Sequence, residues 1–234
     1  LEATPDRPAQ MALLRKEAPF EASTAPNGIF LTHAHIGHYT GLMFLGREAM
    51  NARGVPVYGL GRMVEFLRSN GPWDQLVRYQ NITLAELTDG QEVVLTDGLS
   101  VTPFLVPHRD EYSETVGYRI EGPRKSAVFI PDIDKWQRWD TNIREVVRSV
   151  DYALVDATFY ADGELPGRDM SEIPHPFVAE SMALLEDLTD EEKSRVIFIH
   201  MNHTNPLLID GSPEQAEVEM RGFRSAREGM RLEL

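Results

Sequence analysis

Residues 31–42 read LTHAHIGHYTGL, and this stretch places His33, His35 and His38 close together. The apolar run in front of it predicts a strand, and the apolar spacing after it predicts a helix. Loops that lead from the carboxyl end of a strand to a helix often carry functional residues. Residues i and i+2 of an extended segment point to the same side, so we expect His33 and His35 to bind one cation together. His38 follows a turn at Gly37 and is expected to face a second cation or to share the first.

Three more residues with metal-binding side chains stand where apolar runs end elsewhere in the chain. His108 ends the run VTPFLVPH, His200 ends the run VIFIH, and Asp132 follows the run AVFI. A single histidine at a strand end is usually a polar boundary residue, and the loop histidines alone can be surface or capping residues. Repetition of the pattern beside a histidine cluster favours ligands that converge on a metal ion. Asp132 is short and anionic, which suits a bridging carboxylate, whereas Asp134 is expected to face away or to cap the following turn.

Composition narrows the classes of protein to which the chain can belong. Its 234 residues suit one large domain, which we expect to span 1–234. There is no cysteine, so a transition-metal site must use imidazole and carboxylate ligands. The net charge of −14 argues against a nucleic-acid partner, because such a surface repels phosphates. No apolar run approaches the roughly 18 residues that a membrane span needs.

Short apolar runs alternate with amphipathic stretches along the whole chain, which predicts layers of helix that cover sheets. The predicted strands are 28–32, 55–58, 93–96, 100–107, 116–120, 127–130, 152–155 and 195–199. The predicted helices are 41–53, 63–68, 139–150, 174–188 and 213–223. Residues 1–6 read as the end of a strand followed by a turn. Because the chain starts at Leu1 without a methionine, we expect N-terminal residues of the natural protein to be missing from it.

The loop of three histidines, followed by a later histidine, a later aspartate and a last histidine at strand ends, resembles the metallo-β-lactamase superfamily. The signature of that superfamily is H-x-H-x-D-H. Within it, the chain is most similar to the pyrroloquinoline quinone biosynthesis protein B group. The segments that carry this resemblance cover most of the chain: 31–42, 106–117 (VPHRDEYSETVG), 129–136 (FIPDIDKW), 152–160 (YALVDATFY), 173–182 (IPHPFVAESM) and 198–206 (FIHMNHTNP).

The resemblance implies an α+β fold, an αββα four-layer sandwich whose N-terminal hairpin is absent from this chain. It also implies a centre with one or two divalent metal ions, with zinc as the first expectation and manganese or iron as alternatives. The ligands that it implies are His33, His35 and His108 for the first metal, Asp132 as the bridge, and His38 and His200 for the second metal.

Two departures from the family pattern affect the expected chemistry. Gly37 stands where the superfamily normally has an aspartate that binds the second metal. Asp132, His38 and His200 remain as a set of two histidines and one carboxylate. The biosynthesis-protein group usually keeps the Asp-His pair of this loop and loses the earlier histidine pair, whereas this chain has the reverse.

Two further residues are candidates for catalysis. His175 lies between two prolines at the start of a predicted helix, where it can act as a general acid or help to bind an anion. The alternative is a histidine that only packs at the helix start. Asp156 resembles the acidic residue that orients such a histidine in the distantly similar tRNase Z and cyclic phosphodiesterase branches; the alternative is a strand-end cap.

Several polar residues near the predicted strand ends are candidates for contacts with a ligand histidine or with substrate. His203 can hold His200 or touch substrate, and Arg109 can meet an anionic substrate. The remaining candidates also lie in loops that follow predicted strands; they are Asn202, Asn205 and Asp110.

The leading functional hypothesis is a metal-dependent hydrolase of a phosphodiester, ester or amide bond in a small molecule. The alternative is an iron-dependent oxygenase of quinone cofactor biosynthesis, and a third hypothesis is a degenerate metal-binding domain without turnover. We expect a cytoplasmic protein without a membrane partner. The sequence is compatible with a homo-oligomer.

Overall fold

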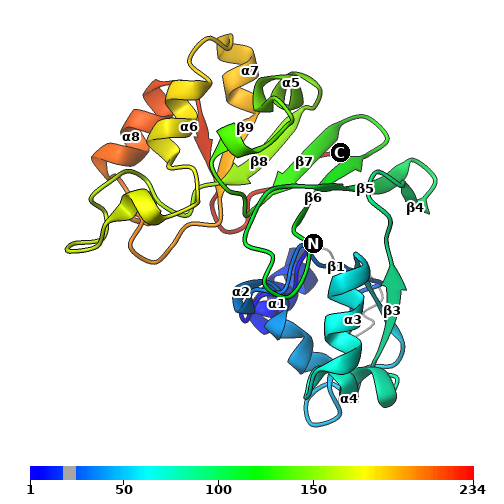
Figure 1. The fold of residues 1–234 in the computed structure, drawn as a ribbon. Helices are drawn as coiled ribbons and strands as arrows, with labels where there is room; N and C mark the ends of the chain where they lie inside the picture. The colour runs from blue at the N-terminus through cyan, green and yellow to red at the C-terminus, as the bar shows by residue number, and fades with distance from the viewer. Residues whose placement is uncertain (18–24) are drawn as a thin grey trace. The chain divides into compact units, whose positions relative to one another are not determined.

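The computed structural model describes residues 1–17 and 25–234, and the chain divides into two compact units (Figure 1). The first unit comprises Leu1–Gln91 and Asp110–Thr115, and the second comprises Glu92–Arg109 and Val116–Leu234. Each unit contains one sheet and its own apolar core. None of the helices in the described ranges has the length and apolar character needed to cross a membrane.

The second unit is built on a mixed seven-stranded sheet. Its strands in chain order are β4 (Val93–Thr96), β5 (Leu99–Leu105), β6 (Val116–Glu121), β7 (Ser126–Ile130), β8 (Tyr152–Asp156), β9 (Val196–Ile199) and β10 (Arg224–Ser225). They lie in the order β10-β9-β8-β7-β6-β5-β4. Neighbours from β4 to β7 are antiparallel, and neighbours from β7 to β10 are parallel. Strands β5, β7, β8 and β9 therefore run in the same direction and end at the same edge of the sheet.

Helices cover one face of this sheet and form the core of the second unit (Figure 1). The helices are α5 (Ile143–Arg148), α6 (Val178–Leu184), α7 (Asp190–Arg195) and α8 (Pro213–Met220), with short 3-10 helices η2 (Trp136–Arg138), η3 (Met170–Glu172) and η4 (Pro206–Leu208) in the connections. Alternate strand residues point to one face, so Val128, Val155 and Phe198 meet helix residues such as Val147 and Met182 in one buried cluster. This packing fixes the strands whose ends carry the candidate site residues.

The first unit is built on a parallel three-stranded sheet in the order β1-β2-β3, with β1 (Ile29–Phe30), β2 (Val55–Gly59) and β3 (Ile82–Glu86). Its helices are α1 (Arg7–Glu17), α2 (Ile36–Tyr39), η1 (Thr40–Leu45), α3 (Gly61–Ser69) and α4 (Trp73–Arg78). Strand residues Val57 and Ile82 pack with Leu42 of η1 and Leu67 of α3 in the core of this unit. The histidine loop leaves β1, as the pattern of the sequence predicted. The expected turn at Gly37 was wrong, because α2 begins at Ile36, inside the predicted loop, and includes Gly37 and His38.

The first residues of the chain are held against the histidine loop by backbone hydrogen bonds. Glu2 N donates to the carbonyl of Phe30 at 2.7 Å, and Ala3 N donates to that of His38 at 3.0 Å. Gly41 N in turn donates to the carbonyl of Ala3 at 2.8 Å. A Cβ at Gly41 would lie 2.1 Å from the Thr4 carbonyl oxygen, so only glycine permits this close approach.

The predicted strands all match strands of the structure, with bounds that differ by a few residues at most. Strands β3 and β10 and helices α1, α2, α4 and α7 are present although the sequence did not predict them. The turn predicted near the start lies at residues 5–6, but no strand is assigned to residues 1–4.

Three helix predictions were several residues too long, and the reasons are local. The helix predicted over 139–150 spans only Ile143–Arg148, and the side chain of Asn142 caps its start by accepting from Arg144 N. The helix predicted over 41–53 is a 3-10 helix that ends at Leu45, because Gly46 adopts an extended conformation. The helix predicted over 174–188 begins only at Val178 and ends at Leu184. A residue before proline disfavours the helical region, and this applies to His175 before Pro176, while Phe177 is also extended.

Candidate metal centre

The second unit gathers five candidate side chains at the edge where its aligned strands end. His108 follows β5, Asp132 follows β7, Asp156 ends β8 and His200 follows β9. His175 joins them from the segment before α6. One ligand atom from each of Asp132, Asp156 and His175 lies within 4.8 Å of the other two. The convergence that the sequence pattern predicted within this unit is therefore present.

Asp156 is the fully buried acceptor that organises this cluster. One of its oxygens, Oδ1, accepts hydrogen bonds from the backbone N–H and hydroxyl of Thr158, at 2.8 Å and 2.7 Å. The other, Oδ2, accepts from the backbone N–H of Ile133 at 3.1 Å and lies 2.8 Å from Nδ1 of His175. These contacts meet the requirement that a buried carboxylate be hydrogen-bonded. The alternative of a simple strand-end cap does not describe a residue with these contacts.

His175 is held between two carboxylates. Its Nδ1 lies 2.8 Å from Oδ2 of Asp156 and 3.1 Å from Oδ1 of Asp132. Burial on its own lowers the pKa of His175, but the charge of Asp156 and hydrogen bonds to Asp132 and Asp156 outweigh burial and raise the pKa to about 10. Because α6 begins only at Val178, the expectation that His175 stands at a helix start was wrong, and the anion-binding argument drawn from it does not apply.

Two other residues of this edge have one ring nitrogen held and the other turned towards Asp132. His108 places Nδ1 3.2 Å from Oδ1 of Asp134 and Nε2 3.4 Å from Oδ1 of Asp132. The expectation that Asp134 faces away was wrong, since its carboxylate holds His108 and also accepts from Arg138 at 3.1 Å. A carboxylate behind a histidine fixes its tautomer, which is the arrangement typical of metal-binding histidines.

His200 is oriented in a comparable way by a hydroxyl group. The Thr158 hydroxyl donates to Asp156, so its oxygen can accept from Nδ1 of His200 at 2.9 Å. The Nε2 atom of His200 lies 3.8 Å from Oδ2 of Asp132. His200 also has a φ of +62°, which is a strained backbone for a residue other than glycine. Such strain at a strand end is common at functional sites, and sequence reasoning did not detect Thr158.

The first unit brings the three loop histidines together. Nε2 of His33 lies 2.8 Å from Nδ1 of His35, and the ring centroids of His33 and His38 are 4.2 Å apart. The second ring nitrogen of His35, Nε2, lies 2.9 Å from a carboxylate oxygen of Glu111. Nδ1 of His38 lies 2.7 Å from Oε1 of Glu2. Sequence reasoning missed Glu2, because only the backbone pairing of the first residues brings it to the loop.

The remaining candidates are more peripheral. Asn205 is buried and its side chain is committed to structure, since Nδ2 donates to the carbonyl of Ala157 at 2.7 Å and Oδ1 accepts from Leu207 N. The expectation that Asn205 contacts substrate is therefore not supported. Asn202 donates to Thr204 and lies 3.1 Å from Nδ1 of the exposed His203. Two others, Arg109 and Asp110, are exposed loop residues.

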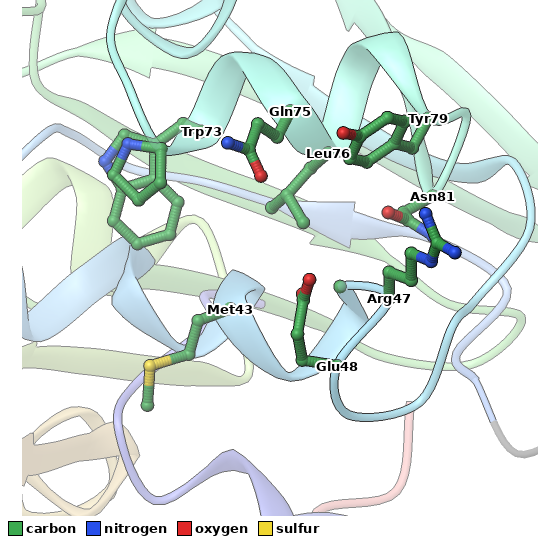
Figure 2. Close-up of a pocket in the computed structure, with 10 residues that line it drawn as sticks. Met43, Arg47, Glu48, Trp73, Gln75, Leu76, Tyr79 and Asn81 are labelled. Atoms are coloured by element: carbon green, nitrogen blue, oxygen red, sulfur yellow. The ribbon is translucent and has the colours of Figure 1, made fainter.

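A separate pocket of about 160 Å³ lies in the first unit, between η1 and α4 (Figure 2). Leu76 and Trp73 line it together with Met43, Glu48 and Arg47 (Figure 2). None of the candidate ligands or catalytic residues lines this pocket, so we do not assign it to the metal centre.

The donor set tests whether a metal ion fits these residues. It consists of buried imidazoles and carboxylates without thiolates, and His33, His108 and Asp132 are each at most 8% exposed. Buried groups of this kind require a cation or hydrogen bonds to offset the loss of water. Imidazole and carboxylate ligands suit zinc, manganese and iron. The residues therefore fit a divalent metal ion, and the donor set does not select among these metals.

Comparison with known proteins agrees with the fold. Residues 1–201 match the model of the beta-lactamase superfamily domain. Coenzyme PQQ synthesis protein B of Cupriavidus necator is 31% identical over 259 residues, which cover 100% of this chain and 82% of the relative. The crystal structure of zinc-bound PqqB from Methylobacterium extorquens has a TM-score of 0.80 and 24% identity, and covers 100% of this chain and 82% of that chain. A diphosphatase of the PhnP family has a TM-score of 0.61 and 21% identity, with coverage of 100% and 78%.

The chain therefore belongs to the beta-lactamase superfamily, and its α+β fold is of the metallo-β-lactamase type, which confirms the predicted fold class. Within that superfamily it falls in the group of coenzyme PQQ synthesis protein B, as the resemblance of the sequence indicated.

Proposed function

We propose that this chain is a metal-dependent hydrolase that cleaves a phosphodiester, ester or amide bond of a small molecule. The observation that carries the proposal is the position of His175, whose Nδ1 lies between the carboxylates of Asp156 and Asp132 at the strand-end edge. A protonated histidine in such a place suits the donation of a proton to a leaving group. Similarity of fold to a diphosphatase supports the same class of reaction.

The proposed metal centre uses the ligands that the sequence pattern and the family imply. When bound, a divalent metal lowers the pKa of a coordinated water from its value in bulk water towards about 7 and polarises the bond to be cleaved. Zinc is the first candidate, with manganese or iron as alternatives, and one or two ions are allowed. The proposed ligands are His33, His35 and His108 for the first ion, Asp132 as the bridge, and His38 and His200 for the second.

The residues around this centre have distinct proposed roles. Because Nδ1 of His175 faces two carboxylates, Nε2 is the atom that gives a proton to the leaving group. Asp156 keeps that ring oriented and charged. Arg109, Asn202 and His203 lie in loops after the strands and are proposed to contact substrate. We also propose that residues 1–234 act as one domain, that the protein works in the cytoplasm, and that it is a monomer or a homo-oligomer.

A second function is favoured by the relatives themselves. The 31% identity to coenzyme PQQ synthesis protein B favours an enzyme of quinone cofactor biosynthesis. For this second function we propose a reaction that uses iron and oxygen. A site of two histidines and one carboxylate with open positions supports oxygen chemistry when iron is bound. The two functions differ in whether oxygen is consumed, so they can be separated directly.

The test of the proposed function compares hydrolysis with oxygen uptake. The protein is loaded with zinc or manganese, or with iron in the absence of oxygen. Hydrolysis is assayed with bis(p-nitrophenyl) phosphate and p-nitrophenyl acetate. Oxygen uptake is measured separately, with tyrosine-containing peptides as substrates. We expect metal-dependent release of p-nitrophenolate that Asp132→Asn abolishes. The exposed Asp140 provides the matched control, because Asp140→Asn is expected to keep the activity.

The outcomes separate the alternatives. Oxygen uptake without hydrolysis contradicts the hydrolase and favours the oxygenase. Metal binding without either reaction, over a broad set of phosphodiesters, esters and amides, favours a domain that binds metal without turnover.

A further inference from the structure

Gly37 leaves the histidine loop without the carboxylate that the superfamily signature contains, and nothing in the described residues requires a glycine there. A Cβ built at Gly37 meets no atom within 4 Å, and its φ is not in the left-handed region. Glycine is therefore not present for steric or backbone reasons. A side chain at this position has room, so the missing carboxylate is a change of chemistry rather than of fold.

Another carboxylate, that of Glu2, lies in the same loop. Its side chain is only 6% exposed, and Oε1 lies 2.7 Å from Nδ1 of His38. The Thr32 hydroxyl donates to the same oxygen of Glu2, and it lies 3.0 Å from Nδ1 of His33. Glu2 thus brings a buried negative charge to two of the three loop histidines.

The backbone around Glu2 is firmly placed. Hydrogen bonds join Glu2 to Phe30 and Ala3 to His38, and the close approach at Gly41 fixes the next residues. Glu2 has a φ of +63°, a left-handed conformation that is strained for a residue other than glycine. A strained residue that buries a charge beside histidines fits a site where that charge is used.

We propose that Glu2, His33 and His38 form a divalent-cation site in which Glu2 is the carboxylate ligand that replaces the one lost at Gly37. One ligand atom from each of the three residues lies within 4.8 Å of the other two, as binding of one cation requires. Two imidazoles and one carboxylate suit zinc, manganese or iron(II). The inference rests on the proposed metal centre and changes it in two respects. It adds a ligand that the sequence pattern did not predict, and it places His33 and His38 on one shared ion instead of on two different ions.

The test measures metal affinity rather than turnover. The full chain is stripped with chelator and titrated with zinc in competition with a chromophoric chelator, and with cobalt(II) as a spectroscopic probe. Glu2→Gln is expected to lower the affinity of this site by more than about 100-fold, which exceeds the 10–100-fold typical of a residue that only orients a ligand. The visible cobalt spectrum is expected to change as one ligand is lost.

A compensating substitution makes the test specific. Because Gly37 has room for a side chain, the double variant Glu2→Gln/Gly37→Asp is expected to recover affinity to within about tenfold of the parent chain. The matched control is Glu65→Gln, which alters an exposed carboxylate of α3 and is expected to leave the affinity within about threefold. If Glu2→Gln does not fold, Gly37→Asp alone decides: a gain of more than about tenfold contradicts a site already supplied with its carboxylate, whereas little gain supports it.

Failure of this inference is distinguishable from failure of the proposed function. Metal binding by the parent chain with unchanged affinity in Glu2→Gln overturns the role of Glu2 and leaves the hydrolase standing. A loss of 10–100-fold with an unchanged cobalt spectrum shows that Glu2 only orients His38, and overturns its role as a ligand. Absence of any metal binding overturns both. Loss of metal in Glu2→Gln without hydrolysis by the parent chain supports the site and overturns the hydrolase.

Discussion

At the scale of single residues, Asp156 and His175 form the best-defined pair of the candidate centre. The carboxylate of Asp156 is fully buried and receives three hydrogen bonds, from Ile133 and Thr158, in addition to its contact with His175. The raised pKa of His175 keeps the ring protonated through neutral pH, since the charged ring is favoured until the pH approaches about 10. The pair therefore places a histidine where a hydrolase needs a general acid.

Substitution of His175 tests that link. If His175 donates a proton to the leaving group, His175→Gln lowers kcat by about 10²–10⁴-fold for substrates with alkoxide leaving groups. The loss should be much smaller for p-nitrophenolate, which leaves without a proton. Steady-state kinetics with a series of leaving groups, together with metal content, make the measurement. Equal losses for all leaving groups contradict the role of general acid.

The sequence allowed the histidines and Asp132 to be predicted, because each follows an apolar run that ends in a polar residue. Glu2, Thr158 and Asp134 were missed or misplaced, since their roles depend on contacts that no local pattern records. Glu2 reaches the loop through backbone pairing with Phe30, more than twenty-five residues away in the chain. The candidate histidines and Asp132 could thus be selected from the sequence, whereas the contacts of Glu2, Thr158 and Asp134 could not.

At the scale of elements, the strands were predictable because runs of apolar, often β-branched residues are short and end at Gly, Asp or Pro. The ends of the helices were less predictable than the strands, because they depend on the backbone conformation of a few residues. The extended residues Gly46 and Phe177 stop or delay helices whose apolar spacing continues past them. The helix α7, predicted by no apolar pattern, is stabilised by a capping box between Thr189 and Glu192.

Packing of β9 should stabilise the fold and should also fix the position of the sheet edge that carries His200. Phe198 is fully buried in the core of the second unit. Phe198→Ala is expected to lower the free energy of unfolding by about 3–5 kcal/mol, from lost burial and the cavity left behind. Urea denaturation measures this free energy of unfolding. The control is Leu208→Ala, because Leu208 is 55% exposed and its substitution should change stability by no more than about 0.5 kcal/mol. A loss below about 1 kcal/mol for Phe198→Ala contradicts the described core.

At the scale of the whole molecule, the chain combines a family fold with an altered ligand set. Its fold and its similarity to coenzyme PQQ synthesis protein B place it in that group. The histidine pair His33 and His35, the glycine at 37 and the carboxylate of Glu2 distinguish its loop. The fold class followed from the sequence because the family motifs extend over most of the chain, whereas the division into two compact units did not.

Metal content tests the central claim of this account most directly. The chain is purified without chelators, and bound metal per chain is measured by element-resolved mass spectrometry for the parent, His33→Ala and His200→Ala. If these histidines bind a divalent metal, the parent carries one or two ions per chain and each variant loses metal. A parent chain without stoichiometric metal, or variants that keep the same content as the parent, would contradict it.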